Sequence, residues 1–252
     1  MSYHTLVASV TVQFTLKIAG REMEASARVP AGPARVVDAL PVLHGIAGAV
    51  VEAAEEGKRI SCRAGCGACC RQLVPIAEAE ARYLAALIQS LPEVRERFKA
   101  AVAALDAAGL GDRLRRLEQL APAERQALGL EYFHLGVACP FLEDESCSIH
   151  PSRPMSCREY SVTSPVGNCR NPHPETIAMV PLPVKPSVLL FHFGDGKGED
   201  RLRFLPLILA LEWVAEHEDD PQTELEGSDL LLNFLRKLTV KRAQTESSGR
   251  TE

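Results

Sequence analysis

Outside one central stretch the sequence has no cysteine: all eight lie between Cys62 and Cys169, and residues 1–61 and 170–252 hold none. Aromatic residues make up only 5%, and the 33 acidic residues outnumber the 28 basic ones, so the net charge is -5. This chain therefore lacks the strong positive charge and the stacking side chains that nucleic-acid binding needs. We do not expect nucleic acid as a partner.

Neither an uncharged run of about 20 residues nor a secretory leader is expected from the sequence. The uncharged run over residues 204–211 is far shorter than the roughly 20 apolar residues that cross a bilayer. The start, residues 1–4, contains no basic region ahead of a continuous apolar run. We therefore expect a cytoplasmic protein that does not bind a membrane.

The spacing of apolar residues predicts both strands and helices. Strict alternation over residues 6–18 and 23–29 predicts a β-hairpin with one buried face. A second apolar run, residues 188–193, predicts a short strand, and Pro41 predicts a kink or a split in the first helix. Apolar residues three and four apart predict helices over residues 34–57 and 76–90, after Pro92, around Leu114, after Pro122, and over residues 200–216 and 229–240.

Prolines are concentrated in the second half of the cysteine-containing region. Residues 139–186 hold nine of the 17 prolines and four of the eight cysteines, which excludes long helices and central strands there. This segment is too apolar to be disordered, and a bound metal would hold it in place. We expect a mainly helical α+β fold made of an N-terminal β-hairpin, helices and an irregular Cys/Pro-rich metal-binding segment.

Three regions follow from these patterns. Residues 1–57 are expected to form the hairpin plus a helix, and residues 58–190 the cysteine-cluster metal-binding domain. A helical insert, residues 76–130, interrupts that domain, and residues 191–252 supply C-terminal helices that pack on the same core. The insert must return the chain to the first cysteine run if both cysteine groups are to share a site.

The cysteines have the spacing of metal ligands. Cys66 and Cys69 form a C-x2-C pair, whose turn brings two thiolates within reach of one ion, and Cys70 follows directly. In the cytosol thiols stay reduced, so a dense cluster favours metal ligation over a disulfide framework, unpartnered thiols or a redox relay. The eight candidate ligands are Cys62, Cys66, Cys69, Cys70, Cys139, Cys147, Cys157 and Cys169.

Basic residues flank these thiols, and two of them are candidates for binding the cofactor. Four thiolates around Zn2+ or a [4Fe–4S]2+ core leave a net charge of about -2, which nearby donors would neutralise. Arg153 and Arg158 stand on either side of Cys157 and are our candidates for this role. Thiolate ligands suit zinc and iron–sulfur clusters alike. The number of cysteines and the Cys139-Pro140 pair favour an iron–sulfur cluster of the [4Fe–4S] type, with zinc as the alternative.

Several sequence blocks together resemble a known family. The run over residues 65–72 (GCGACCRQ), then Cys139-Pro-Phe-Leu, Cys147-Ser-Ile-His and the block over residues 153–160 (RPMSCREY), is similar in order to the CxxCxxCC family of zinc- or iron-chelating proteins. The resemblance spans residues 62–169. One departure is Arg63, which stands where the family name would place a cysteine, so Cys62 is a less secure ligand than its neighbours.

The resemblance implies a cytosolic metal-binding protein that acts as an accessory, structural or redox module, with a protein as a further partner. Some members resemble flagellin lysine N-methylases, which implies an alternative: an iron–sulfur-dependent, S-adenosylmethionine-using protein lysine N-methyltransferase. In that case Glu78, Tyr160 or His173 would supply polar groups to the reaction. The glycines of residues 194–198 would form an anion-binding loop ahead of a helix. A tight turn explains these glycines equally well, and whether the protein is an enzyme stays open.

Overall fold

The computed structural model describes residues 8–18, 21–173, 175–193 and 202–240. The α-helices of this part are α1 (Val36–Glu55), α2 (Glu78–Ile88), α3 (Pro92–Ala107), α4 (Gly111–Arg115), α5 (Pro122–Leu135), α6 (Met155–Arg158), α7 (Pro186–Phe191), α8 (Ala210–Glu216) and α9 (Gly227–Val240). The 3-10 helices are η1 (Ala68–Arg71), η2 (Leu117–Gln119), η3 (His150–Ser152), η4 (Val166–Arg170) and η5 (Leu207–Leu209).

Strands form only small antiparallel pairs in the described residues. They are β1 (Ser9–Ile18) with β2 (Arg21–Pro30), β3 (Pro33–Arg35) with β8 (Glu224–Glu226), β4 (Pro75–Ile76) with β7 (Leu205–Pro206), and β5 (Leu142–Glu143) with β6 (Ser146–Cys147). The mainly helical α+β fold that the sequence predicts is confirmed.

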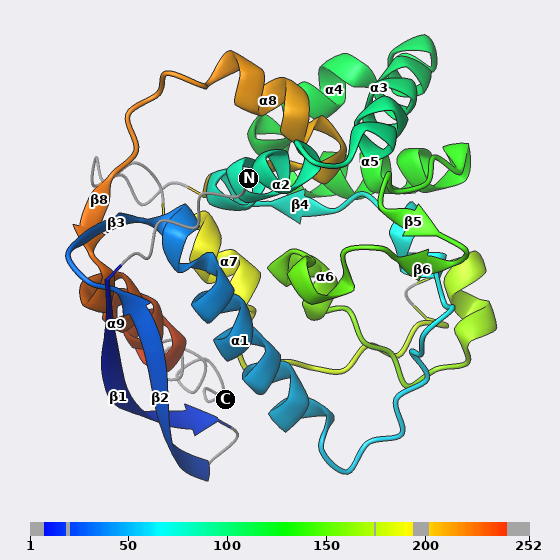
Figure 1. The fold of residues 1–252 in the computed structure, drawn as a ribbon. Helices are drawn as coiled ribbons and strands as arrows, with labels where there is room; N and C mark the ends of the chain where they lie inside the picture. The colour runs from blue at the N-terminus through cyan, green and yellow to red at the C-terminus, as the bar shows by residue number, and fades with distance from the viewer. Residues whose placement is uncertain (1–7, 19–20, 174, 194–201, 241–252) are drawn as a thin grey trace, which may run out of the picture.

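The predicted N-terminal hairpin is present and packs beside α1 and α9 (Figure 1). Its strands pair in register from Ser9 opposite Pro30 to Ile18 opposite Arg21. Leu16 and Val29 are buried in a core that α1, α7 and α9 also line, whereas Val10 is 43% exposed. The alternating apolar face is therefore covered over only part of its length.

Helix α1 runs without interruption through Pro41, so the split predicted at this proline is wrong. Pro41 is the sixth residue of the helix and removes one i→i−4 hydrogen bond, and the extensive burial of α1 in the core offsets this loss. This helix is long and apolar enough to cross a membrane by length and composition. Leu40, Leu43 and Val50 on α1 are buried in the core, so packing inside the protein accounts for its apolar character.

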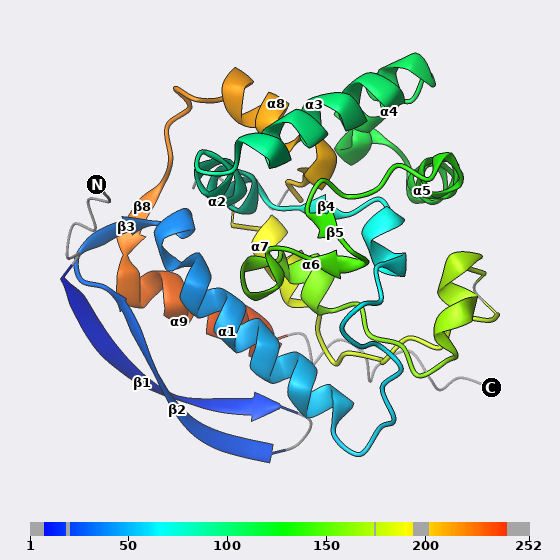
Figure 2. The ribbon, with the colours of Figure 1, turned by 45° about the vertical axis from the view of Figure 1, so that its right-hand side comes forward.

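The helical insert forms a second hydrophobic core, which lies on the opposite side of α1 from the hairpin (Figures 1 and 2). Ile76, Leu84 and Phe98 from the insert meet Phe141 from the second cysteine segment, and Phe98 and Phe141 contact edge to face at 5.5 Å. A third cluster joins α3, α4 and α5 to η5. The insert thus folds back on itself and packs directly against the start of the second cysteine segment.

Two predictions for the C-terminal part need correction. The apolar run 188–193, predicted as a strand, lies largely in helix α7, because Pro186 occupies the first helical position and pre-sets its backbone angle. A short apolar run has no periodicity that distinguishes a buried strand from a buried helix. The helix predicted over residues 200–216 is confirmed only for α8, because β7 and η5 precede it.

Candidate metal centre

The two cysteine segments meet where the helical insert ends. The backbone N–H of Cys139 donates a 2.7 Å hydrogen bond to the carbonyl oxygen of Cys70. The N–H of Leu142 then donates to the carbonyl of Cys139 at 2.9 Å, and Leu142 pairs with Cys147 across β5 and β6. One tight backbone unit therefore brings Cys70, Cys139 and Cys147 together.

The first cysteine run is shaped by its glycines. Gly65 has φ +79°, a left-handed conformation that side chains disfavour, and it turns the chain toward η1. Gly67 faces the β5–β6 turn, and a Cβ there would lie 2.7 Å from Leu142 Cδ1 and 3.2 Å from Glu145 Cα. The two glycines allow the run to wrap closely around the second segment.

An ion pair closes this contact on the outside. Arg71 donates to the carbonyl of Gly67 at 3.0 Å and to both carboxylate oxygens of Glu145, the shorter bond being 2.6 Å. Glu145 is in the left-handed region with φ 58°, as is Asp144 with φ 47°, which makes the turn between β5 and β6 tight. Arg71 thus links the first run to the turn that precedes Cys147.

The last cysteine approaches the first run from another direction. Cys169 lies in η4, which packs against η1, and it is buried. On the way there, the N–H of Ser61 donates to the carbonyl of Val162 at 2.9 Å, and Gln72 donates to the hydroxyl of Tyr160 at 3.0 Å. Both ends of the first cysteine run are therefore attached to the chain that leads to Cys169.

Electrostatic effects connect Cys69 with most of the other thiols. A charge on Cys69 contributes to the thiol pKa of six other cysteines, which are Cys62, Cys70, Cys139, Cys147, Cys157 and Cys169. Cys66 is coupled to Cys62 and Cys169. All eight sulfur atoms thus belong to one electrostatically connected group.

The thiol pKa values show how costly it is to charge this group. A side-chain hydrogen bond from Cys70 lowers the pKa of Cys69 to about 7, and the same bond raises that of Cys70. Burial raises the pKa of Cys139 to about 12 and that of Cys157 well above its usual range. Several thiolates together therefore need a positive partner, which a metal supplies.

Arg153 lies beside the thiols. The pKa of Cys69 is lowered first by the hydrogen bond from Cys70 and further by the positive charge of Arg153. Burial raises the pKa of Cys147, and the charge of Arg153 acts to lower it. Its guanidinium also contacts the ring of His150, whose pKa is lowered by burial and by this charge. Arg153 Nε is buried and makes no hydrogen bond to the described residues.

Arg158 has a different position from Arg153. It donates to the carbonyl oxygens of Arg153 (2.9 Å) and Pro151, so it holds the backbone of this loop, and burial lowers its pKa. Cys157 in turn acts to raise the pKa of Arg158, so both arginines carry charge close to thiols, and Arg158 also supports the chain that carries Arg153.

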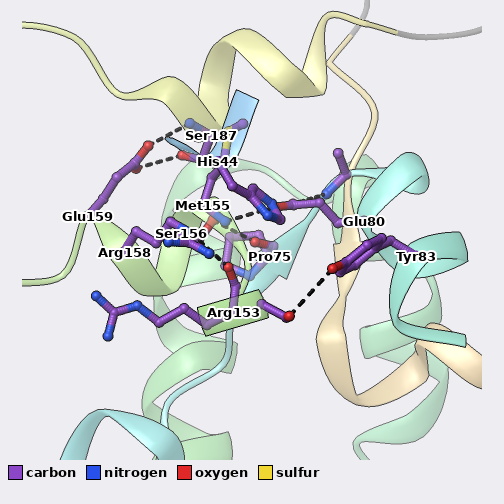
Figure 3. Close-up of polar contacts among 12 residues, drawn as sticks. His44, Pro75, Glu80, Tyr83, Arg153, Met155, Ser156, Arg158, Glu159 and Ser187 are labelled. Carbon is purple, nitrogen blue, oxygen red and sulfur yellow. Dashed lines mark hydrogen bonds and ion pairs between the residues drawn. The ribbon is translucent and has the colours of Figure 1, made fainter. Parts of the chain in front are cut away.

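The burial of two carboxylates beside this region is not apparent from the sequence (Figure 3). Glu80 on α2 is 1% exposed and accepts the backbone N–H of Met155 at 2.7 Å. Glu159 accepts the N–H and the hydroxyl of Ser187, and burial raises its pKa to about 7. The only sequence signal for Glu80 is its place three residues after a helix start, where a carboxylate commonly caps the helix.

The residues considered for methyl transfer lie in separate surroundings. Glu78 pairs with Arg203 at 3.5 Å and lines two surface cavities of about 190 and 350 Å³ that neither Tyr160 nor His173 lines. Tyr160 bonds Gln72, and His173 is in an irregular segment. The glycines of residues 194–198 lie outside the described residues. These positions add no support to the enzyme alternative.

The donor set fits a metal, although its final arrangement is not preformed. Among the described residues, which include all eight cysteines, no three His, Cys, Asp or Glu side chains are already placed to hold one ion. Thiolates are ligands for zinc and for iron–sulfur clusters, and the free thiols here come from turns and short helices. Side chains in these turns would need to converge on the metal.

Comparison with known proteins agrees with this reading of the site. Residues 61–176 match the model of the CxxCxxCC family, described as a "putative zinc- or iron-chelating domain". This range contains both cysteine groups, and the resemblance predicted from the sequence is confirmed. No curated protein and no solved structure matches the chain.

Proposed function

We propose that this protein, whose residues 61–176 match the model of a zinc- or iron-chelating domain, is a cytoplasmic metal-binding protein whose cysteines hold a [4Fe–4S] cluster. Zn2+ is the alternative occupant. The centre joins two cysteine segments that the helical insert separates in sequence, so it serves as a structural or redox module for this protein or a protein partner. No catalytic step is assigned to it.

The observation that carries this proposal is the contact between the two cysteine segments, in which the N–H of Cys139 donates to the carbonyl of Cys70 at 2.7 Å and β5 and β6 bring Cys147 back beside them. Thiols gathered in this way repel one another when they ionise, and burial makes the charges still less favourable. Binding a cation converts this repulsion into ligation. The free energy of binding then stabilises the fold, because the ligands come from distant parts of the chain.

One feature favours iron and sulfur over zinc. One Zn2+ ion and one [4Fe–4S] cluster each take four cysteine ligands, so the eight sulfur atoms do not choose between them. Arg153 places a fixed positive charge near Cys69 and Cys147, and charge and hydrogen bonds near cluster sulfur atoms tune reduction potential. When bound, a cluster would supply one-electron redox chemistry, and Arg153 would stabilise its more negative, reduced state.

Purification without oxygen, followed by visible spectroscopy and analysis for iron, zinc and acid-labile sulfide, tests the proposal. We expect a brown protein with broad visible absorption and iron matched by sulfide. Colourless protein with stoichiometric zinc would replace the cluster by the zinc alternative. Protein with neither metal after reconstitution would overturn the metal-binding function altogether.

A matched pair of variants in η1 checks that the metal is bound at the cysteine site. Cys69→Ser replaces one sulfur of the first cysteine run, whereas Ala68→Ser adds the same hydroxyl one residue earlier and keeps every thiol. We expect Cys69→Ser to lose most of the bound metal and Ala68→Ser to retain it. Equal metal content in the two variants would place the metal elsewhere.

A further inference from the structure

One of the candidate ligands belongs to a very short helix. Cys157 lies in the four-residue α6, and its side chain is half-buried. A helix of this length is not stable by its own hydrogen bonds. The position of the Cys157 sulfur therefore depends on contacts that other elements make with α6.

The first of these contacts comes from Glu80 (Figure 3). Its Oε1 accepts the backbone N–H of Met155, the first residue of α6, at 2.7 Å. Its Oε2 accepts the N–H of Ala77, the residue before α2, at 3.0 Å, and Nε2 of His44 on α1 is 3.4 Å from Oε1. One carboxylate thus connects three helices and satisfies a backbone donor at the start of α6.

Capping α2 does not by itself explain why Glu80 is buried. Glu124 occupies the equivalent third position of α5 and accepts the N–H of Ala121 at 2.8 Å, yet Glu124 is exposed to solvent. Moving a carboxylate out of water is unfavourable unless hydrogen bonds compensate for the loss. In Glu80 the additional bonds are those to Met155 and His44, and the bond to Met155 leads directly to the cysteine site.

The other residues around Cys157 are also attached to separate elements. Ser156 Oγ donates to the carbonyl of Pro75 in β4 at 2.7 Å. Arg158 Nε donates to the carbonyl of Arg153 at 2.9 Å, and Glu159 accepts the hydroxyl of Ser187 in α7 at 2.7 Å. These bonds fix the backbone on both sides of Cys157, with Glu80 at the end where the helix starts.

We propose that Glu80 is a positioning residue for the metal centre: by holding the start of α6 it directs the Cys157 thiol toward the other cysteines. The inference rests on the proposed function, because it assigns Cys157 as a ligand. Buried residues that orient metal ligands in this way typically contribute 10- to 100-fold to metal affinity. Glu80 acts through Met155 and the α6 backbone without touching the metal.

The test compares Glu80→Ala and Glu80→Gln with Glu124→Ala in the full chain. The Glu124 variant removes the same type of helix cap at an exposed site, so it controls for the loss of the cap. One measurement is Zn2+ affinity by competition with a chromophoric chelator. The other, in metal-free protein, is the alkylation rate of each cysteine by iodoacetamide, read by mass spectrometry.

We expect Glu80→Ala to weaken Zn2+ binding by about 10- to 100-fold and to raise the alkylation rate of Cys157 selectively. Glu80→Gln keeps one carbonyl oxygen for Met155 and should lose less affinity, and Glu124→Ala should match the wild type. Unchanged affinity in both Glu80 variants would overturn the inference. Equally faster alkylation of all eight cysteines would also do so, because that pattern means general unfolding.

A failure of the proposed function gives a different result. Wild-type protein that binds neither Zn2+ nor reconstituted iron refutes the metal centre itself. The positioning of Cys157 is then decided by alkylation in metal-free protein alone. Selective exposure of Cys157 in Glu80→Ala supports it, and unchanged reactivity refutes it.

Discussion

The N–H of Cys139 donates a 2.7 Å hydrogen bond to the carbonyl oxygen of Cys70, across the whole helical insert. This backbone contact joins the last cysteine of the first run to the first cysteine of the second. Because no sulfur atom takes part in it, replacing a thiol by a hydroxyl leaves the contact intact. Serine variants at this site therefore test metal ligation more than they test the fold.

Removing one of the inner ligands should release the metal. We expect Cys66→Ser and Cys157→Ser to lose bound metal and to lower the stability of the metal-loaded protein by several kcal/mol, since the binding energy of a structural site is folding energy. Cys62, exposed at the edge of the group, should matter less when changed to serine. Elemental analysis and thermal unfolding measure both effects, and unchanged metal in the first two variants would contradict a shared site.

Removing the metal should loosen one region selectively. Residues 139–176 contain short strands and single turns, so their backbone has few regular hydrogen bonds without a metal, whereas α1 is a long buried helix. We expect a chelator, with a reductant, to increase amide hydrogen exchange in residues 139–176 while α1 stays protected. Equal loss of protection in α1 would mean that the metal holds the whole protein together.

The close approach at Gly67 can be tested with a methyl group. Gly67→Ala places a Cβ against Leu142, Glu145 and the β5–β6 turn, and we expect a loss of about 1–2 kcal/mol in unfolding free energy. Gly48→Ala is the matched control: this glycine is inside α1 with open space around its Cβ position, so alanine should stabilise the helix by about 0.5–1 kcal/mol. Chemical denaturation measures both, and a stabilising Gly67→Ala would refute the tight contact.

The start of α1 should give a pH-dependent contribution to stability. A hydrogen bond from Arg35 lowers the pKa of Asp38, so this carboxylate stabilises the fold above the unfolded pKa of about 3.9. That stability is lost as the pH falls through the lower folded-state pKa. The pair is partly exposed, so screening by solvent keeps its contribution below about 1 kcal/mol.

Asp38→Asn is therefore expected to be slightly less stable than the wild type at pH 7, with a difference that shrinks as the pH falls below about 4. Urea unfolding at several pH values measures this. Asp112→Asn serves as the control, because the Asp112 side chain is 88% exposed and lies 4.0 Å from Arg115. A wild-type advantage that is constant from pH 7 to pH 3 would mean that the carboxylate charge is not responsible.

Local patterns predicted most of the elements. The alternation before Ile18 and after Arg21 predicted the hairpin, and the three-and-four spacing around Leu40 and Leu84 predicted α1 and α2. Each of these patterns repeats over two or more turns of helix or several strand residues. Where the pattern was short, as in the run that became α7, the sequence did not separate helix from strand.

The residues of the candidate site also fall into two groups: those that the sequence identifies and those that only the structure shows. Its eight thiols and the adjacent Arg153 are recognisable from residue type and spacing alone. Glu80 could not be found in this way, because its sequence context matches that of Glu124 and only one of the two is buried. Burial depends on which segment packs against each helix, and no local pattern encodes this.

The sequence by itself determined the chemistry of this protein: a cysteine group confined to residues 62–169, a proline-rich segment that cannot form long helices, and a family resemblance to metal-chelating domains. The tertiary structure alone decided that Cys70 lies against Cys139, that Cys147 returns beside them across β5 and β6, and that Glu80 accepts the N–H of Met155 at the start of α6. Ligand type is a property of single side chains, whereas their convergence requires the insert to fold and return the chain to its starting point.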